Sequence, residues 1–98
     1  MLDVTISGGT VVTPSGARLM DVHIADGVIA AVTIPGTEGF ESAQTIDATG
    51  MIVVPGGVEP HAHIGGPRQP ERSGAEPVSK AAIFGGTTTV LDFATQVP

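Results

Sequence analysis

The sequence predicts a mixed α/β chain in which a β-rich first half is followed by the opening of a parallel α/β architecture. Residues 1–50 hold short runs of alternating apolar and polar residues, separated by Gly, Pro and Asp-Gly turns. Residues 51–54 are apolar on both faces, as in a strand buried on both sides of a parallel sheet. A helical pattern over 73–84 then precedes a β-branched strand at 87–93. Strand, helix and strand in this order predict a βαβ unit with parallel strands.

In the first half, the turns define the strands. Gly8-Gly9 is expected to break the first run, which resumes at residues 10–13. A further strand places Met20, Val22 and Ile24 on one face. Asp21 and His23 alternate with apolar residues on that strand, so His23 is interpreted as a solvated residue without a function. Asp26-Gly27 between two apolar runs predicts a type I′ hairpin, because both central positions need positive φ.

In the second half, the helix has clear start and stop signals. Ser73 is a candidate N-cap with Glu76 three residues later, as in a capping box, and Gly85-Gly86 ends the helix. One helix covers only one face of its sheet, so the fold is incomplete as given. The chain is therefore interpreted as a fragment, or one part of a split protein. Its domains are a β-rich subdomain at 1–50 and the start of a larger α/β domain at 51–98.

The composition excludes several classes of function. The 98 residues carry four Lys and Arg against ten Asp and Glu, a net charge of −6. This charge disfavours nucleic acid and anionic membranes as partners. There is no apolar run of about 18 residues that could span a bilayer, and the first residues lack the pattern of a signal peptide. The absence of cysteine excludes a disulfide framework and fits a cytoplasmic location.

His61 and His63 are the candidate metal ligands. Side chains at i and i+2 of a strand point to the same face, with Cβ atoms roughly 6–7 Å apart. Two imidazoles at that spacing can bind one metal ion. The pair follows an apolar strand, and the carboxyl ends of such strands are where parallel α/β folds place their active sites. The alternative is that the two histidines only decorate the surface.

The order of the motifs adds to this interpretation. The chain resembles the amidohydrolase superfamily, and within it the dihydropyrimidinase and hydantoinase branch, over essentially all of its length. The resemblance depends on the following segments: Asp26-Gly27, Ile46-Asp47-Ala48-Thr49-Gly50, Pro55-Gly56-Gly57, Pro60-His61-Ala62-His63 and Gly85-Gly86-Thr87-Thr88.

The resemblance implies a (β/α)8 TIM-type barrel flanked by a small β-sandwich, to which residues 1–50 contribute. It implies that His61 and His63 bind one Zn²⁺ of a two-metal centre that hydrolyses the ring amide of hydantoins or dihydropyrimidines. A carboxylated lysine, two further histidines and an aspartate would come from the missing C-terminal portion of the barrel. No catalytic residue is therefore expected within this chain, which should be inactive alone. The complete protein is expected to be a homo-oligomer.

Some residues depart from the family pattern. Glu59 stands where the family has Asp, and its extra methylene is expected to loosen the geometry near the histidines. Gly65 stands where dihydroorotases carry an Arg that holds a substrate carboxylate, so a dihydroorotase is disfavoured. The remaining charged residues are interpreted as structural or surface residues: Arg68, Arg72, Lys80 and Asp92.

Two other functions compete with this interpretation. The first is a non-catalytic, dihydropyrimidinase-like protein used for assembly, which the presence of both His61 and His63 disfavours. The second is an autonomous β-rich binding module, which the exposed parallel edge of residues 51–98 disfavours.

Overall fold

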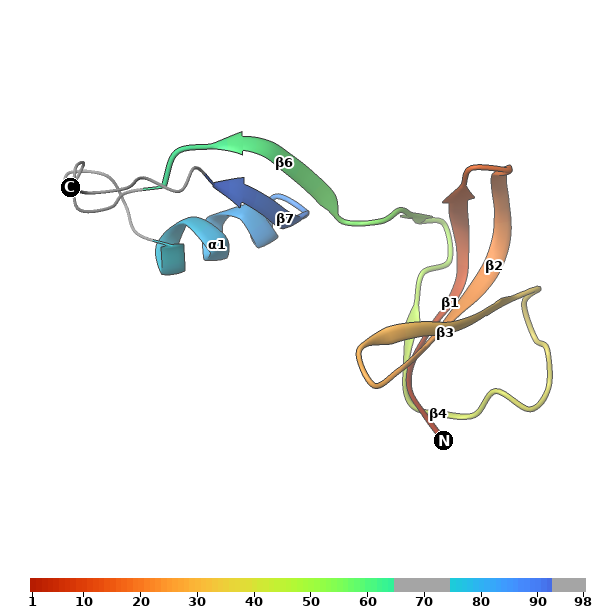
Figure 1. Ribbon diagram of the computed structural model, residues 1–98. Coiled ribbons are helices and arrows are strands. Elements are labelled where there is room, and N and C mark those ends of the chain that lie inside the picture. The colour runs from red at the N-terminus through yellow and green to blue at the C-terminus, as the bar shows by residue number, and fades with distance from the viewer. Residues whose placement is uncertain (65–74, 93–98) are drawn as a thin grey trace, which may run out of the picture. The chain divides into compact units, whose positions relative to one another are not determined.

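The computed structural model describes residues 1–64 and 75–92. The chain divides into two compact units, Met1–Val54 and Pro55–Pro98, which are described separately here (Figure 1). Among the described residues, no helix has the length and apolar character needed to cross a membrane.

The first unit is a five-stranded sheet. Its spatial order is β3-β2-β1-β4, and β5 also pairs with β1. The β1–β2 and β2–β3 pairs are antiparallel, whereas β4 and β5 both run parallel to β1. The strands are β1 (Leu2–Thr13), β2 (Gly16–Ala25), β3 (Val28–Thr33), β4 (Ser42–Asp47) and β5 (Ile52–Val53).

The predicted Asp26-Gly27 hairpin is confirmed. Asp26 has φ 51° and Gly27 has φ 74°, as a type I′ turn requires at both central positions. Ala25 and Val28 pair directly across this turn.

The predicted break at Gly8-Gly9 is wrong, because β1 runs through both glycines. Gly8 has φ 72°, and the β1–β2 register shifts between Ile6 and Gly9, so the strand absorbs an irregularity without ending. Gly9 allows β5 to approach: a Cβ at this position would lie 2.5 Å from Val53 Cγ2.

Residues 51–54 also differ from their prediction as a doubly buried strand of the second unit. Ile52 and Val53 instead pair with Thr10 and Val11 in the first sheet. Ile52 is 72% exposed. The division between the units falls after Val54, later in the chain than the predicted boundary after residue 50. An apolar run predicts a strand but does not specify which sheet the strand joins.

The expectation that His23 is solvated is wrong. His23 is only 2% exposed, and its ring stacks on Phe40 with centroids 4.4 Å apart. Its Nδ1 lies 2.9 Å from Thr5 Oγ1 and its Nε2 lies 2.8 Å from Thr33 Oγ1. The strand alternation correctly places His23 opposite the apolar face. It does not show that β2 is an inner strand, or that Phe40 covers this second face.

The second unit contains a parallel strand pair and one helix. They are β6 (Gly57–Ala62), α1 (Ala75–Phe84) and β7 (Thr87–Asp92). β6 and β7 are parallel and α1 packs against β7, so the predicted βαβ unit is present, with β6 as its first strand (Figure 1). Gly86 ends the helix as predicted, with φ 86° and a hydrogen bond from its N–H to Ile83 O. The predicted N-cap Ser73 lies outside the described residues.

Candidate metal centre

The two candidate ligands lie at the carboxyl end of β6. His61 is the second-last residue of β6, and His63 is the first residue after the strand ends. Since β6 and β7 are parallel, both strands end at the same edge of their sheet. The pair therefore lies at the edge where parallel α/β folds build their sites.

The two rings converge. His61 Nε2 and His63 Nε2 are 3.2 Å apart, and the ring planes meet at 65°. Two nitrogen ligands of a tetrahedral zinc ion, each about 2.0–2.1 Å from the metal, lie about 3.3–3.4 Å apart. The two Nε2 atoms form a hydrogen bond in this structure, and their spacing is also close to that of two ligands of one zinc ion. Both side chains are exposed within this chain, so an ion and further ligands have access to them.

The pair alone does not complete a metal site. Within residues 1–64 and 75–92, no group of three or more His, Cys, Asp or Glu side chains is arranged to hold a metal ion. Structural and catalytic zinc sites have at least three protein ligands. The assignment of His61 and His63 as metal ligands therefore stays a prediction. Further ligands from outside these residues would be needed to complete the site.

Glu59 contacts the backbone of the first histidine. Its Oε1 accepts a hydrogen bond from His61 N at 3.0 Å. The longer side chain at this position thus still reaches the strand end. The expected loosening of the site by the extra methylene stays a prediction.

Asp92, to which the sequence analysis assigned no chemistry, also contacts this segment. It is the last residue of β7 and pairs with Ala62 across the parallel strands. Its Oδ1 accepts a hydrogen bond from Ile64 N at 3.1 Å. The signal available in the sequence was the parallel βαβ unit, which brings the ends of the two strands together.

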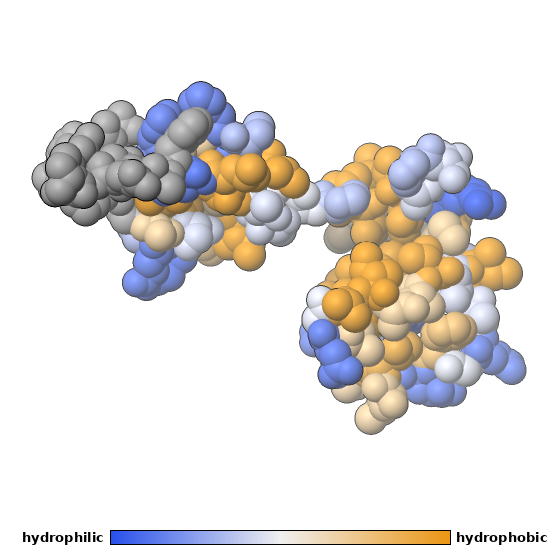
Figure 2. All heavy atoms as spheres, in the orientation of Figure 1, coloured by the Kyte–Doolittle hydropathy of each residue, from blue (hydrophilic) through white to orange (hydrophobic). Residues whose placement is uncertain are grey.

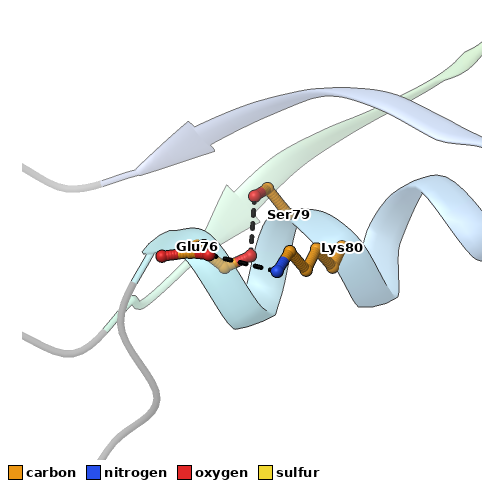
Figure 3. A network of polar contacts seen from close by, with 3 residues as sticks. All are labelled: Glu76, Ser79 and Lys80. Carbon is orange, nitrogen blue, oxygen red and sulfur yellow. Dashed lines mark hydrogen bonds and ion pairs between the residues drawn. The ribbon is translucent and has the colours of Figure 1, made fainter.

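Lys80 lies on the exposed surface of α1, as predicted. Its Nζ forms an ion pair with Glu76 Oε1 at 3.1 Å, one helical turn away (Figure 3). Ser79 Oγ donates to the carbonyl oxygen of Glu76 on the same helix. Three other positions considered in the sequence analysis lie outside the described residues: Gly65, Arg68 and Arg72.

The chain is similar to known amidohydrolases. It is 43% identical to a D-hydantoinase of Streptomyces coelicolor, over 93% of this chain and 21% of the relative. It is 37% identical to an allantoinase of Escherichia coli, over 92% of this chain and 19% of that protein. No protein-family model matches the chain.

Solved structures of hydantoinases and related deacylases are also similar to the chain. An L-hydantoinase (dihydropyrimidinase) from Arthrobacter aurescens matches 95% of this chain and 21% of its own, with a TM-score of 0.84 and 34% identity. An N-acyl-D-glutamate deacylase from Bordetella bronchiseptica, solved with zinc and a phosphonate inhibitor, matches 91% of this chain and 18% of its own, with a TM-score of 0.69 and 31% identity.

The chain thus spans about a fifth of the length of the relatives that it matches. Both the predicted resemblance and the predicted fold class are confirmed by these matches. The chain is thus similar, over most of its own length, to hydantoinases and allantoinases.

Proposed function

We propose that this chain is the N-terminal part of a metal-dependent cyclic amidohydrolase that acts on the ring amide of hydantoins or dihydropyrimidines. The observation that carries the proposal is the convergence of His61 and His63 at the carboxyl end of β6. It occurs in a chain that is similar to hydantoinases and an allantoinase over most of its length.

His61 and His63 would hold one zinc ion of a two-metal centre through their Nε2 atoms. When bound, zinc supplies Lewis acidity, which polarises a carbonyl group and makes water a better nucleophile at neutral pH. The role of this chain is to present the two imidazoles at the strand end, with Glu59 holding the backbone of His61. Two ligands leave the site unfinished, so the 98 residues alone are expected to be inactive.

The proposal includes the rest of the molecule. The βαβ unit of β6, α1 and β7 would open a (β/α)8 barrel whose remaining strands bring the other metal ligands. Association into a homo-oligomer and a cytoplasmic location complete the proposal. The location is supported by the absence of cysteine from the sequence.

The experiment is substitution of His61→Ala in the full-length protein. Zinc content, measured by inductively coupled plasma mass spectrometry, should fall from about two ions per subunit in the parent to about one. Hydrolysis of hydantoin and dihydrouracil should be abolished, while the circular dichroism spectrum is retained. Lys80→Ala, which removes an exposed charge from α1, should change neither quantity.

Two results would contradict the proposal. Hydrolysis by His61→Ala at the parent rate would remove the histidine pair from the chemistry. A metal-free parent without hydrolytic activity would instead favour the non-catalytic assembly protein.

A further inference from the structure

The backbone that carries the histidine pair is held at both ends by carboxylates. Glu59 Oε1 accepts from the N–H of His61, and Asp92 Oδ1 accepts from the N–H of Ile64. The two bonds bracket the segment from 61 to 64. Glu59 belongs to β6 and Asp92 belongs to β7.

The two carboxylates do different things. Glu59 lies two residues before His61 on the same strand, so its bond sets only the local conformation of the chain. Asp92 comes from β7, so its bond fixes the end of β6 relative to the neighbouring strand. Asp92 thus ties the backbone just beyond His63 to β7, in addition to the ladder pair of Ala62 with Asp92.

The strand pairing is irregular along this segment. The β6–β7 register is irregular between Glu59 and Ala62, which is the stretch that contains His61. His63 lies beyond the last residue of β6. The bond from Ile64 N to Asp92 Oδ1 therefore extends the link between β6 and β7 past the last ladder pair, to the residue after His63.

We propose that Asp92 is a positioning residue, which holds His61 and His63 in the geometry that binds one metal ion by accepting the backbone N–H of Ile64. This inference rests on the proposed function, since it assigns Asp92 a role toward the same metal. Asp92 acts on the histidines through the backbone of Ile64. The role therefore requires a side chain at the end of β7 that can accept a hydrogen bond.

The test uses the full-length protein with Asp92→Ala and Asp92→Asn. The dissociation constant for Zn²⁺ is measured by competition with a chromogenic chelator, and the Co²⁺-loaded protein gives a ligand-field spectrum that reports coordination geometry. Asp92→Ala should weaken zinc binding about tenfold, the lower end of the loss seen when a partner of a metal ligand is removed, because Asp92 bonds the residue after His63 and not the ligand itself. It should also shift the Co²⁺ spectrum. Asp92→Asn keeps an acceptor oxygen, and its zinc affinity should stay within about threefold of the parent, well under that loss.

Asp3→Asn is the matched control. Asp3 Oδ2 also accepts a backbone N–H across a strand end, from Asp26 at 2.7 Å, but it lies in the first unit. Its zinc affinity and Co²⁺ spectrum should equal those of the parent. Circular dichroism and thermal melting of the metal-free proteins show whether each variant folds.

The outcomes separate the two proposals. Unchanged zinc affinity in a folded Asp92→Ala variant, with zinc lost in His61→Ala, overturns the role of Asp92 alone. Unchanged zinc affinity in both variants overturns the proposed function. If Asp92→Ala does not fold, Asp92→Asn decides: a loss of tenfold or more in that folded variant would show that the charge itself is needed, and overturns the positioning role.

Discussion

Asp21 connects three segments of the first unit through its carboxylate. Oδ1 accepts from Gly8 N at 2.8 Å and from Ser7 Oγ at 3.1 Å, and Oδ2 accepts from Gly36 N at 3.3 Å. Burial raises the pKa of Asp21, but the hydrogen bonds from Gly8, Gly36 and Ser7, together with the nearby His23, lower the pKa more. The pKa therefore lies below its ordinary value of 3.8. Asp21 thus stabilises both the irregularity in β1 and the loop after β3.

Asp21→Asn should destabilise the first unit by about 1–3 kcal/mol at neutral pH. It removes the charge of a buried group and replaces one of the two acceptor oxygens by an NH2 group, which cannot accept a backbone N–H. Because the folded-state pKa is depressed, this contribution is complete above the ordinary value of 3.8 and is lost as the pH falls through the folded-state pKa. The difference in melting temperature between parent and variant should therefore shrink from pH 6 to pH 3.

The control for this measurement is Glu38→Gln, which removes the same charge from an exposed loop position. Its melting temperature should follow the parent at both pH values. A difference between parent and Asp21→Asn that stays constant down to pH 3 would show that the carboxylate is not what stabilises the loop.

At the scale of elements, the pairing of β6 with β7 determines where the histidines lie. Gly57 N donates to Gly86 O at 2.8 Å at the start of the pair. Gly56, directly before β6, faces Thr88 so closely that a Cβ would overlap the threonine side chain. The close approach of the two strands thus depends on the absence of a side chain at this position.

Gly56→Ala should therefore separate the start of β6 from β7 and destabilise the second unit by about 1–3 kcal/mol, as overpacking does. Hydrogen exchange followed by mass spectrometry should show faster exchange in peptides from β6 and β7. Gly85→Ala is the matched control, because a Cβ there would make only an ordinary contact, 3.5 Å from Ala82 O. Equal protection in the two variants would contradict this account of Gly56.

The elements show which features could be predicted from the sequence. The Asp26-Gly27 hairpin and the helix stop at Gly85-Gly86 depend on local backbone conformation, and both are confirmed. The convergence of His61 and His63 follows from the i, i+2 spacing, which is also local. Sequence patterns were sufficient to predict a feature where the residues that form it are close together in the sequence.

Predictions failed where a distant partner decides the outcome. Residues 52–53 join β1 because Gly9 leaves room for Val53, a contact that spans more than 40 positions. His23 is buried because Phe40 covers it. Asp92 gained its contact with Ile64 through the register of a parallel pair, which periodicity does not determine.

Over the whole chain, apolar side chains are exposed on both units (Figure 2). Among the described residues, the buried hydrophobic side chains are those of Val11, Val22 and Ala48. The edge strand β3 exposes Val28 and Ile29, at 63% and 66%. The other large exposed apolar residues include Leu19, Ile34, Ile52, Val58, Ile83 and Phe84.

The 98-residue chain expressed alone should therefore self-associate, since exposed apolar surface and open strand edges favour association. Sedimentation velocity should show species larger than a monomer, in amounts that rise with concentration. Ile29→Lys places a charge on the edge strand and should reduce this association, whereas Glu38→Lys in an exposed loop should not. A monodisperse monomer, with residues 80–93 fully protected from hydrogen exchange, would contradict the prediction.

The parallel pairing of β1 with β4 also has a consequence for biosynthesis. β2 and β3 follow β1 directly and can pair as soon as they leave the ribosome, but Leu2 pairs with Ser42 and Val4 with Gln44. At about 5–20 residues per second, the partner of Leu2 is translated roughly 2–8 s later. During that interval the side of β1 that later pairs with β4 is an open strand edge, on which mispairing can occur.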